Sequence, residues 1–132
     1  MRVEKISSLR TLPTIIEKEI DQYKNQEYYD SFVYNDDLYI VASLGMKNTL
    51  GYDISISNII EIDKGKWEVL MDKIQPNKDQ ILAQAITTPL AIVKIIIMTK
   101  GKNTPKEITF KDKKGDIIKK IKVKIKKEKN KP

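Results

Sequence analysis

Residues 53–74 read DISISNIIEIDKGKWEVLMDKI. Ile54, Ile56 and Ile60 are predicted to share one face, with serines among the residues of the other face, which is the pattern of a half-buried strand. Asp-Lys-Gly-Lys at 63–66 is a good turn sequence, and the apolar segment after it can pair back. The stretch therefore predicts a β-hairpin.

Similar segments lie on both sides of this hairpin. The expected strands are 29–34, 38–44, 53–62, 67–74, 81–86, 90–99, 107–111 and 117–127. Asn-Asp-Asp at 35–37 predicts a hairpin turn, and the nearly continuous apolar run 90–99, interrupted by Lys94, is typical of a central strand covered on both faces. The spacing predicts a mainly β fold: an antiparallel β-sandwich or partly open barrel of about eight strands.

One short α-helix is expected before the strands. Thr14 and Glu17 fit a capping box, and Ile16, Ile20 and Tyr23 recur at helical spacing, so we predict a helix over about 14–24. A helix of this length needs a surface to lie on. The expected organisation of the 132 residues is an N-terminal helical segment, 1–27, packed on the sheet of a β domain, 28–132, with a Lys-rich C-terminal strand.

The composition excludes many kinds of site. The chain has no His and no Cys, which removes Cys nucleophiles, His general bases, zinc clusters and disulfides. The adjacent Asp36 and Asp37 are expected to accept backbone hydrogen bonds in a turn. We therefore expect a protein that is not an enzyme, with no catalytic residues, no cofactor and no metal.

The sequence shows no targeting signal. No apolar run approaches the length of a membrane span, and the first 30 residues lack the apolar core of a signal peptide. The chain as written is expected to be cytoplasmic, or exported or surface-associated if it is a mature fragment.

The most distinctive segment is Leu-Gly-Met-Lys-Asn-Thr-Leu-Gly-Tyr at 44–52, between two predicted strands. Its two glycines permit positive φ, but a phosphate-binding loop would need Gly-Lys-Ser/Thr and a helix after it. Two interpretations stay open: a structural turn in which Asn48 and the glycines satisfy the geometry and Tyr52 packs beneath, or a binding surface. The candidate partner-binding residues are Gly45, Lys47, Asn48, Thr49, Leu50, Gly51 and Tyr52.

This segment and the strands beyond it resemble the C-terminal domain of the protease complex subunit PrcB family. The matching residues are Gly45, Lys47, Thr49, Gly51 and Tyr52, then Ile54 and Ile56, then Thr87-Thr88-Pro89 and the strand 90–97. Asn48, Leu50 and Thr88 depart from the family pattern. The resemblance implies a non-catalytic β domain that supports the assembly or stability of a bacterial surface protease complex, with a protein, such as a protease, as partner.

A second likeness supplies an alternative function. Residues 48–52 are similar to the N-P-T-T-G-Y loop of chagasin-type cysteine-peptidase inhibitors, which are immunoglobulin-like sandwiches. The other inhibitory loops are missing, and Trp67 stands in Lys-Trp-Glu instead of Arg-Pro-Trp. The alternative is thus a peptidase inhibitor acting through residues 45–52.

Positive charge gathers at the C-terminus. Residues 100–132 hold 14 of the 25 basic and 4 of the 18 acidic residues of a chain whose net charge is +7. A ladder of lysines at 120, 122, 124 and 126 could bind polyanions or nucleic acid weakly, which is the second alternative function, or could protect an edge strand from sheet-to-sheet pairing. The segment 111–132 has no Arg and no aromatic residue, which favours edge protection. Tyr28, Tyr29, Tyr34 and Tyr39 are expected to be strand packing residues.

Overall fold

The computed structural model describes residues 2–77, 79, 81–96 and 104–126. In chain order the elements are β1 (Arg2–Ile6), the 3-10 turn η1 (Leu9–Thr11), α1 (Thr14–Asp21), β2 (Tyr28–Tyr34), β3 (Asp37–Ser43), β4 (Lys47–Thr49), β5 (Asp53–Asp63), β6 (Lys66–Ile74), β7 (Gln84–Thr87), β8 (Leu90–Ile96), β9 (Glu107–Lys111), β10 (Ile117–Lys122) and β11 (Lys124–Ile125). The fold is mainly β, as predicted.

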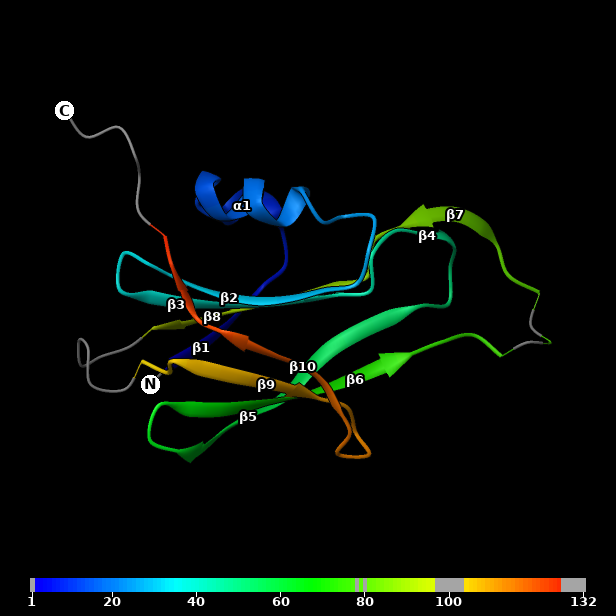
Figure 1. The fold of residues 1–132 in the computed structure, drawn as a ribbon. Helices are drawn as coiled ribbons and strands as arrows, with labels where there is room; N and C mark the ends of the chain where they lie inside the picture. The colour runs from blue at the N-terminus through cyan, green and yellow to red at the C-terminus, as the bar shows by residue number, and fades with distance from the viewer. Residues whose placement is uncertain (1, 78, 80, 97–103, 127–132) are drawn as a thin grey trace.

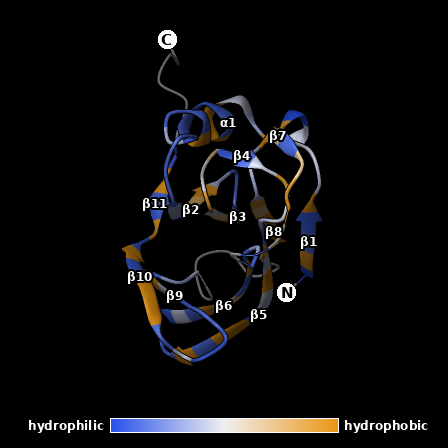
Figure 2. Cartoon of the chain, turned by 90° about the vertical axis from the view of Figure 1, so that its right-hand side faces the viewer, coloured by the Kyte–Doolittle hydropathy of each residue, from blue (hydrophilic) through white to orange (hydrophobic). Residues whose placement is uncertain are grey.

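Two large sheets face each other and form a sandwich (Figures 1 and 2). The first has the order β1-β8-β3-β2-β11, and the second has the order β10-β9-β6-β5. A third sheet consists of β4 and β7. Within the described part of the chain the large sheets do not join into one closed barrel. The predicted antiparallel pairing holds except for β11 with β2 and β6 with β9, which are parallel.

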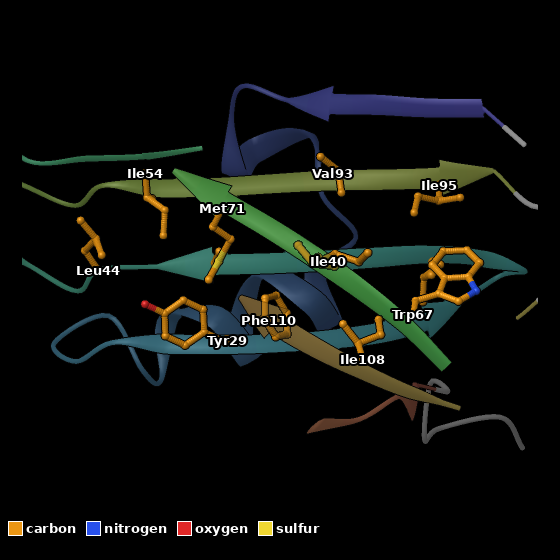
Figure 3. Close-up of a cluster of buried hydrophobic side chains, with 13 residues drawn as sticks. Tyr29, Ile40, Leu44, Ile54, Trp67, Met71, Val93, Ile95, Ile108 and Phe110 are labelled. Carbon is orange, nitrogen blue, oxygen red and sulfur yellow. The ribbon is translucent and has the colours of Figure 1, made fainter. Parts of the chain in front are cut away.

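The hydrophobic core lies between the large sheets, where side chains from both interdigitate (Figure 3). Leu38 and Ile40 of β3, Val69 and Met71 of β6, and Phe110 of β9 are fully buried there. They occupy alternate positions of their strands, which is why the period-2 pattern predicted these segments well. Burial of each such side chain stabilises the fold by about 1.5–3 kcal/mol.

The helix α1 covers the outer face of the five-stranded sheet (Figure 1). Ile16 and Ile20 are buried against a second cluster that includes Phe32, Tyr39 and Val41. Strand β3 therefore has apolar contacts on both faces.

The capping box predicted for this helix is wrong. Pro13 is the N-cap residue, with φ −54° and ψ 140°, and no side chain caps the helix. Thr14 is the first helical residue, because the carbonyl of Pro13 already accepts the N–H groups of Ile16 and Glu17, each at 3.0 Å. The helix ends at Asp21, three residues before the predicted end.

The predicted central strand corresponds to β8, which lies between β1 and β3. Lys94, which interrupts the apolar run, is partly exposed. Its ammonium lies 3.6 Å from the carboxylate of Asp37 in β3. Residues 97–99 of that prediction and residue 127, the end of the last predicted strand, lie outside the described residues.

The described residues form eleven strands, more than the eight that the sequence predicted. Strands β1 and β4 were not expected, and the last predicted strand is divided between β10 and β11. Strands β1, β4 and β11 are short and pair with segments far away in the chain, so local periodicity gives little sign of them. Because β10 and β11 belong to different sheets, the chain crosses between the sheets at Val123.

The predicted inward face of β5 is wrong at one position. The register between β5 and β6 shifts between Ile56 and Asn58, which marks a bulge. A bulge adds one residue and exchanges the faces beyond it. Ile59 therefore packs against the core, whereas Ile60 is 38% exposed.

The division between an N-terminal segment, 1–27, and a β domain, 28–132, stays a prediction. The first segment contributes a strand as well as a helix, because β1 pairs with β8. In the described residues no helix has both the length and the apolar character that crossing a bilayer requires.

Candidate functional site

The distinctive segment begins with a glycine that the backbone requires. Gly45 has φ +80°, and a Cβ atom added there would lie 2.7 Å from the carbonyl carbon of Gln26. The next N–H group, that of Met46, donates to the carbonyl of Lys24 at 2.9 Å. Gly45 thus allows the chain that leaves β3 to lie directly against the turn after α1.

The middle of the segment is a strand and not a loop. Lys47–Thr49 forms β4, which pairs with β7, and the N–H of Leu50 donates to the carbonyl of Ala83 at 3.1 Å. The Thr87 hydroxyl donates to the carbonyl of Thr49 at 3.3 Å. Thr49 and Thr87 stand 38 positions apart, so the sequence around the segment did not reveal the pairing. These bonds fix the segment as a short two-stranded ribbon.

The segment ends in a second constrained glycine. Gly51 has φ +102°, and an added Cβ would lie 3.1 Å from the Pro76 side chain. Tyr52 is half-buried and packs against the main core, and the ammonium of Lys47 lies 4.9 Å from the centre of its ring. The predicted packing of Tyr52 is therefore confirmed.

The predicted turn role of Asn48 is wrong, because Asn48 lies within β4 and is exposed. Among the described residues other than glycine, positive φ occurs at Asn35 and Asp36 in the turn between β2 and β3. That hairpin turn was predicted. In the distinctive segment, positive φ occurs at Gly45 and Gly51 and not at Asn48.

The seven candidate residues lie together but differ in access to solvent. Asn48, Leu50 and Gly51 are exposed, whereas Gly45 is buried. Lys47, Thr49 and Tyr52 are intermediate. A partner could reach the outer residues of the ribbon, and Gly45 can act only by shaping the backbone.

Apart from Leu50, the sequence did not predict the exposed apolar residues at this end of the molecule. We call them the apolar end, and they are Met46 (38% exposed), Leu50 (48%), Ile74 (56%), Ile81 (102%) and Ile86 (74%). Figure 1 shows β4 and β7 at the same end of the molecule as the start of β5 and the end of β6, which belong to the other layer. In the sequence, Ile81 and Ile86 look like core residues of a strand, and nothing local marks them as exposed.

The apolar end offers hydrophobic contact together with a few hydrogen-bonding groups. Lys47 supplies a cation, Asn48 an amide and Thr49 a hydroxyl. In the described residues no group of three or more acidic side chains could hold a metal ion.

The other candidate groups have structural surroundings. Tyr28, Tyr29 and Tyr39 are buried and Tyr34 is half-buried, which confirms the packing prediction. Figure 2 shows β10 at one edge of the four-stranded sheet, where its exposed lysines fit the predicted edge protection.

The predicted ladder of four free lysines is wrong at two positions. Lys124 binds Asp30 at 2.8 Å, and Lys126 binds Glu19 at 2.7 Å. These two ammonium groups join the C-terminal segment to β2 and α1. Only Lys120 and Lys122 of the ladder lack an acidic partner among the described residues.

Comparison with known proteins finds a family model that matches part of the chain. Residues 38–95 match the model described as PrcB C-terminal. This confirms the resemblance stated from the segment at 45–52, the strand that follows it, and Thr87-Thr88-Pro89 with the strand after them. No curated protein and no solved structure matches the chain. The matched residues run from the start of β3 into β8 and include β4, β7 and the whole apolar end.

Proposed function

We propose that this chain, whose residues 38–95 form a domain of the PrcB C-terminal type, is a non-enzymatic protein-interaction module. Its partner would be a protein of a protease or cell-surface complex, which it helps to assemble or stabilise. It would bind that partner through the apolar end, with Lys47, Asn48 and Thr49 supplying polar contacts.

One observation carries this proposal: five large apolar side chains that are at least 38% exposed belong to the ribbon or to segments at the same end of the molecule. Exposed apolar residues gathered in one place are typical of protein-binding surfaces. Burial of a Leu or Ile side chain against a partner gains about 1.5–3 kcal/mol, so several of them together offset much of the entropy that association costs.

The rigidity of the ribbon also supports the proposal. The bond from Leu50 to Ala83 and the bond from Thr87 to Thr49 hold the backbone in place before any partner arrives. A surface that is already ordered loses less conformational entropy on binding. Constrained glycines on both sides of β4 have the same effect.

The test is an affinity pull-down with the full chain as bait, and then measurement of the dissociation constant for the recovered partner. Leu50→Ala combined with Ile86→Ala should weaken binding at least about tenfold, because two buried contacts are lost. Thr49→Ala combined with Leu50→Ala tests the ribbon alone and should weaken binding less.

The matched control is Ile60→Ala with Ile62→Ala. These side chains are 38% and 52% exposed, near the end of β5 that lies away from the ribbon (Figure 1). The control should bind the partner like the unchanged chain. Equal dissociation constants for all variants would show that the apolar end does not contact the partner, and the proposal would be rejected.

A further inference from the structure

A separate hollow of about 390 Å³ lies on the surface between the start of β2 and the segment where β10 leads into β11. The turn after α1 completes its wall. Its volume is within the range of pockets that hold small molecules, about 300–1,000 Å³.

The hollow exists because the chain changes sheets beside it. β11 pairs with β2 only at Phe32 and Val33, whereas β10 pairs with β9 of the opposite sheet. On this side of β2, residues 28–31 therefore have no hydrogen-bonded strand in the described part of the chain, although β10 of the opposite sheet lies near them. The space left at that position is the hollow.

Two stacked aromatic rings contribute to one part of the wall. The rings of Tyr23 and Tyr28 are stacked, with centroids 4.4 Å apart and planes 11° from parallel. Ile121 and Val123, both partly buried, add aliphatic surface. An aromatic body can lie against such a surface.

Most charges around the hollow already have partners. Asp30 binds Lys124 at 2.8 Å and accepts the Tyr28 hydroxyl at 2.9 Å. Glu27 accepts the Tyr29 hydroxyl at 3.1 Å and lies 3.8 Å from the ammonium of Lys73. Neither carboxylate is left to repel an anion unopposed.

Two ammonium groups of the wall have no such partner. Lys119 and Lys122 line the hollow, and across the described residues neither makes an ion pair with an acidic side chain. The phenols add no negative charge, because burial raises the pKa of Tyr28 and Tyr29 above the ordinary value. The hollow therefore joins a flat aromatic surface to two unopposed positive charges.

We propose that this hollow binds a small organic anion, in which a carboxylate or a phosphate is carried on a flat apolar body. The anionic group would lie at Lys119 and Lys122, and the flat body against Tyr23 and Tyr28. The site involves no residue of the apolar end, so it does not depend on the proposed function.

The experiment is a titration of the full, ¹⁵N-labelled chain, monitored by amide correlation spectra. The probes are phenyl phosphate and benzoate, with inorganic phosphate as the probe that lacks a ring. Amide shifts are expected at Tyr23, Tyr28 and residues 119–123. Phenyl phosphate should bind more tightly than inorganic phosphate, and its comparison with benzoate shows which anion the site prefers.

Lys119→Gln combined with Lys122→Gln should weaken binding of phenyl phosphate about tenfold. The matched control is Lys113→Gln with Lys114→Gln, which removes the same charge from the turn between β9 and β10 and should change the dissociation constant less than about twofold. All four lysines are exposed, and the emission of Trp67, the single tryptophan, reports that each variant is folded.

Three results would overturn the proposal. The first is equal weakening by both pairs of substitutions, which means general attraction to a basic surface. The second is equal affinity for phenyl phosphate and inorganic phosphate, which means that the aromatic wall contributes nothing. The third is an absence of shifts at the hollow with millimolar probe.

Discussion

The ammonium of Lys124 lies 2.8 Å from the carboxylate of Asp30, although 94 positions separate the two residues in the chain. The same carboxylate accepts the Tyr28 hydroxyl at 2.9 Å and the Ser31 N–H at 2.8 Å. The Asp30 side chain is 4% exposed, whereas that of Lys124 is 50% exposed. A buried carboxylate with three donors thus fastens the C-terminal strand to β2.

Asp30→Asn should lower the free energy of unfolding by about 2 kcal/mol, because a buried charge that three donors stabilise is lost. Lys124→Gln should cost less, under about 1 kcal/mol, since that side chain is half in water and the other two donors remain. Urea denaturation monitored by Trp67 emission measures both. A larger loss for the lysine variant would contradict the central role of Asp30.

Gly45→Ala should destabilise the protein by more than about 3 kcal/mol, because positive φ and a backbone clash add together. The control is Gly115→Ala. Gly115 has φ +88°, but nothing lies within 4 Å of an added Cβ, so only the backbone penalty of about 1 kcal/mol is expected. Thermal denaturation of the two variants compares the two costs. Similar losses would show that the Gln26 backbone moves aside easily.

Alkaline pH should lower the free energy of unfolding, because buried tyrosines resist ionisation in the folded state. Burial raises the pKa of Tyr28 and Tyr29, and the carboxylates of Asp30 and Glu27 raise them further. Because the phenols hold their protons more tightly in the folded state, this contribution is fully present below the ordinary pKa of about 10 and is lost as pH rises above it.

The expected slope is up to about 1.4 kcal/mol per pH unit for each of these tyrosines above pH 10. Urea denaturation at several pH values measures it. Tyr28→Phe combined with Tyr29→Phe should make the decline shallower, although the raised pKa of Tyr39 and of Lys124 leaves part of it. An unchanged decline would show that Tyr28 and Tyr29 do not cause it.

Exposed and buried apolar residues should differ sharply in their effect on stability. Ile86→Ala should change the free energy of unfolding by less than about 0.5 kcal/mol, because the side chain is 74% exposed. Phe110→Ala should cost about 3–5 kcal/mol, because Phe110 is fully buried. A large loss at Ile86 would mean that this residue supports the fold, which would remove it from the proposed docking surface.

Local pattern was enough to predict the strands that bury alternate side chains, such as Ile40 in β3 and Met71 in β6. It was not enough for β1, β4 and β11, whose partners lie far away in the chain. The bulge after Ile56 depends on the fit of two strands, so the exposure of Ile60 could not be predicted from alternation alone.

The candidate site was predicted in part. The glycines at 45 and 51 marked a shaped backbone, and the structure gives the reason for each. The apolar end was missed because Ile81 and Ile86 have the composition of a buried strand. The pairing of Asp30 with Lys124 has no local signal at all, since each residue alone reads as an ordinary polar position.

The pairing of β11 with β2 also affects the order in which the chain folds during synthesis. Synthesis places Asp30 in the growing polypeptide 94 residues before Lys124. During that interval the nascent chain on the ribosome contains the β2–β3 hairpin without β11. The outer edge of β2 then has no hydrogen-bonded strand, and the Asp30 carboxylate lacks the Lys124 ammonium. The edge is protected only when the lysine-rich segment leaves the exit tunnel, so this edge closes long after the hairpin itself can form.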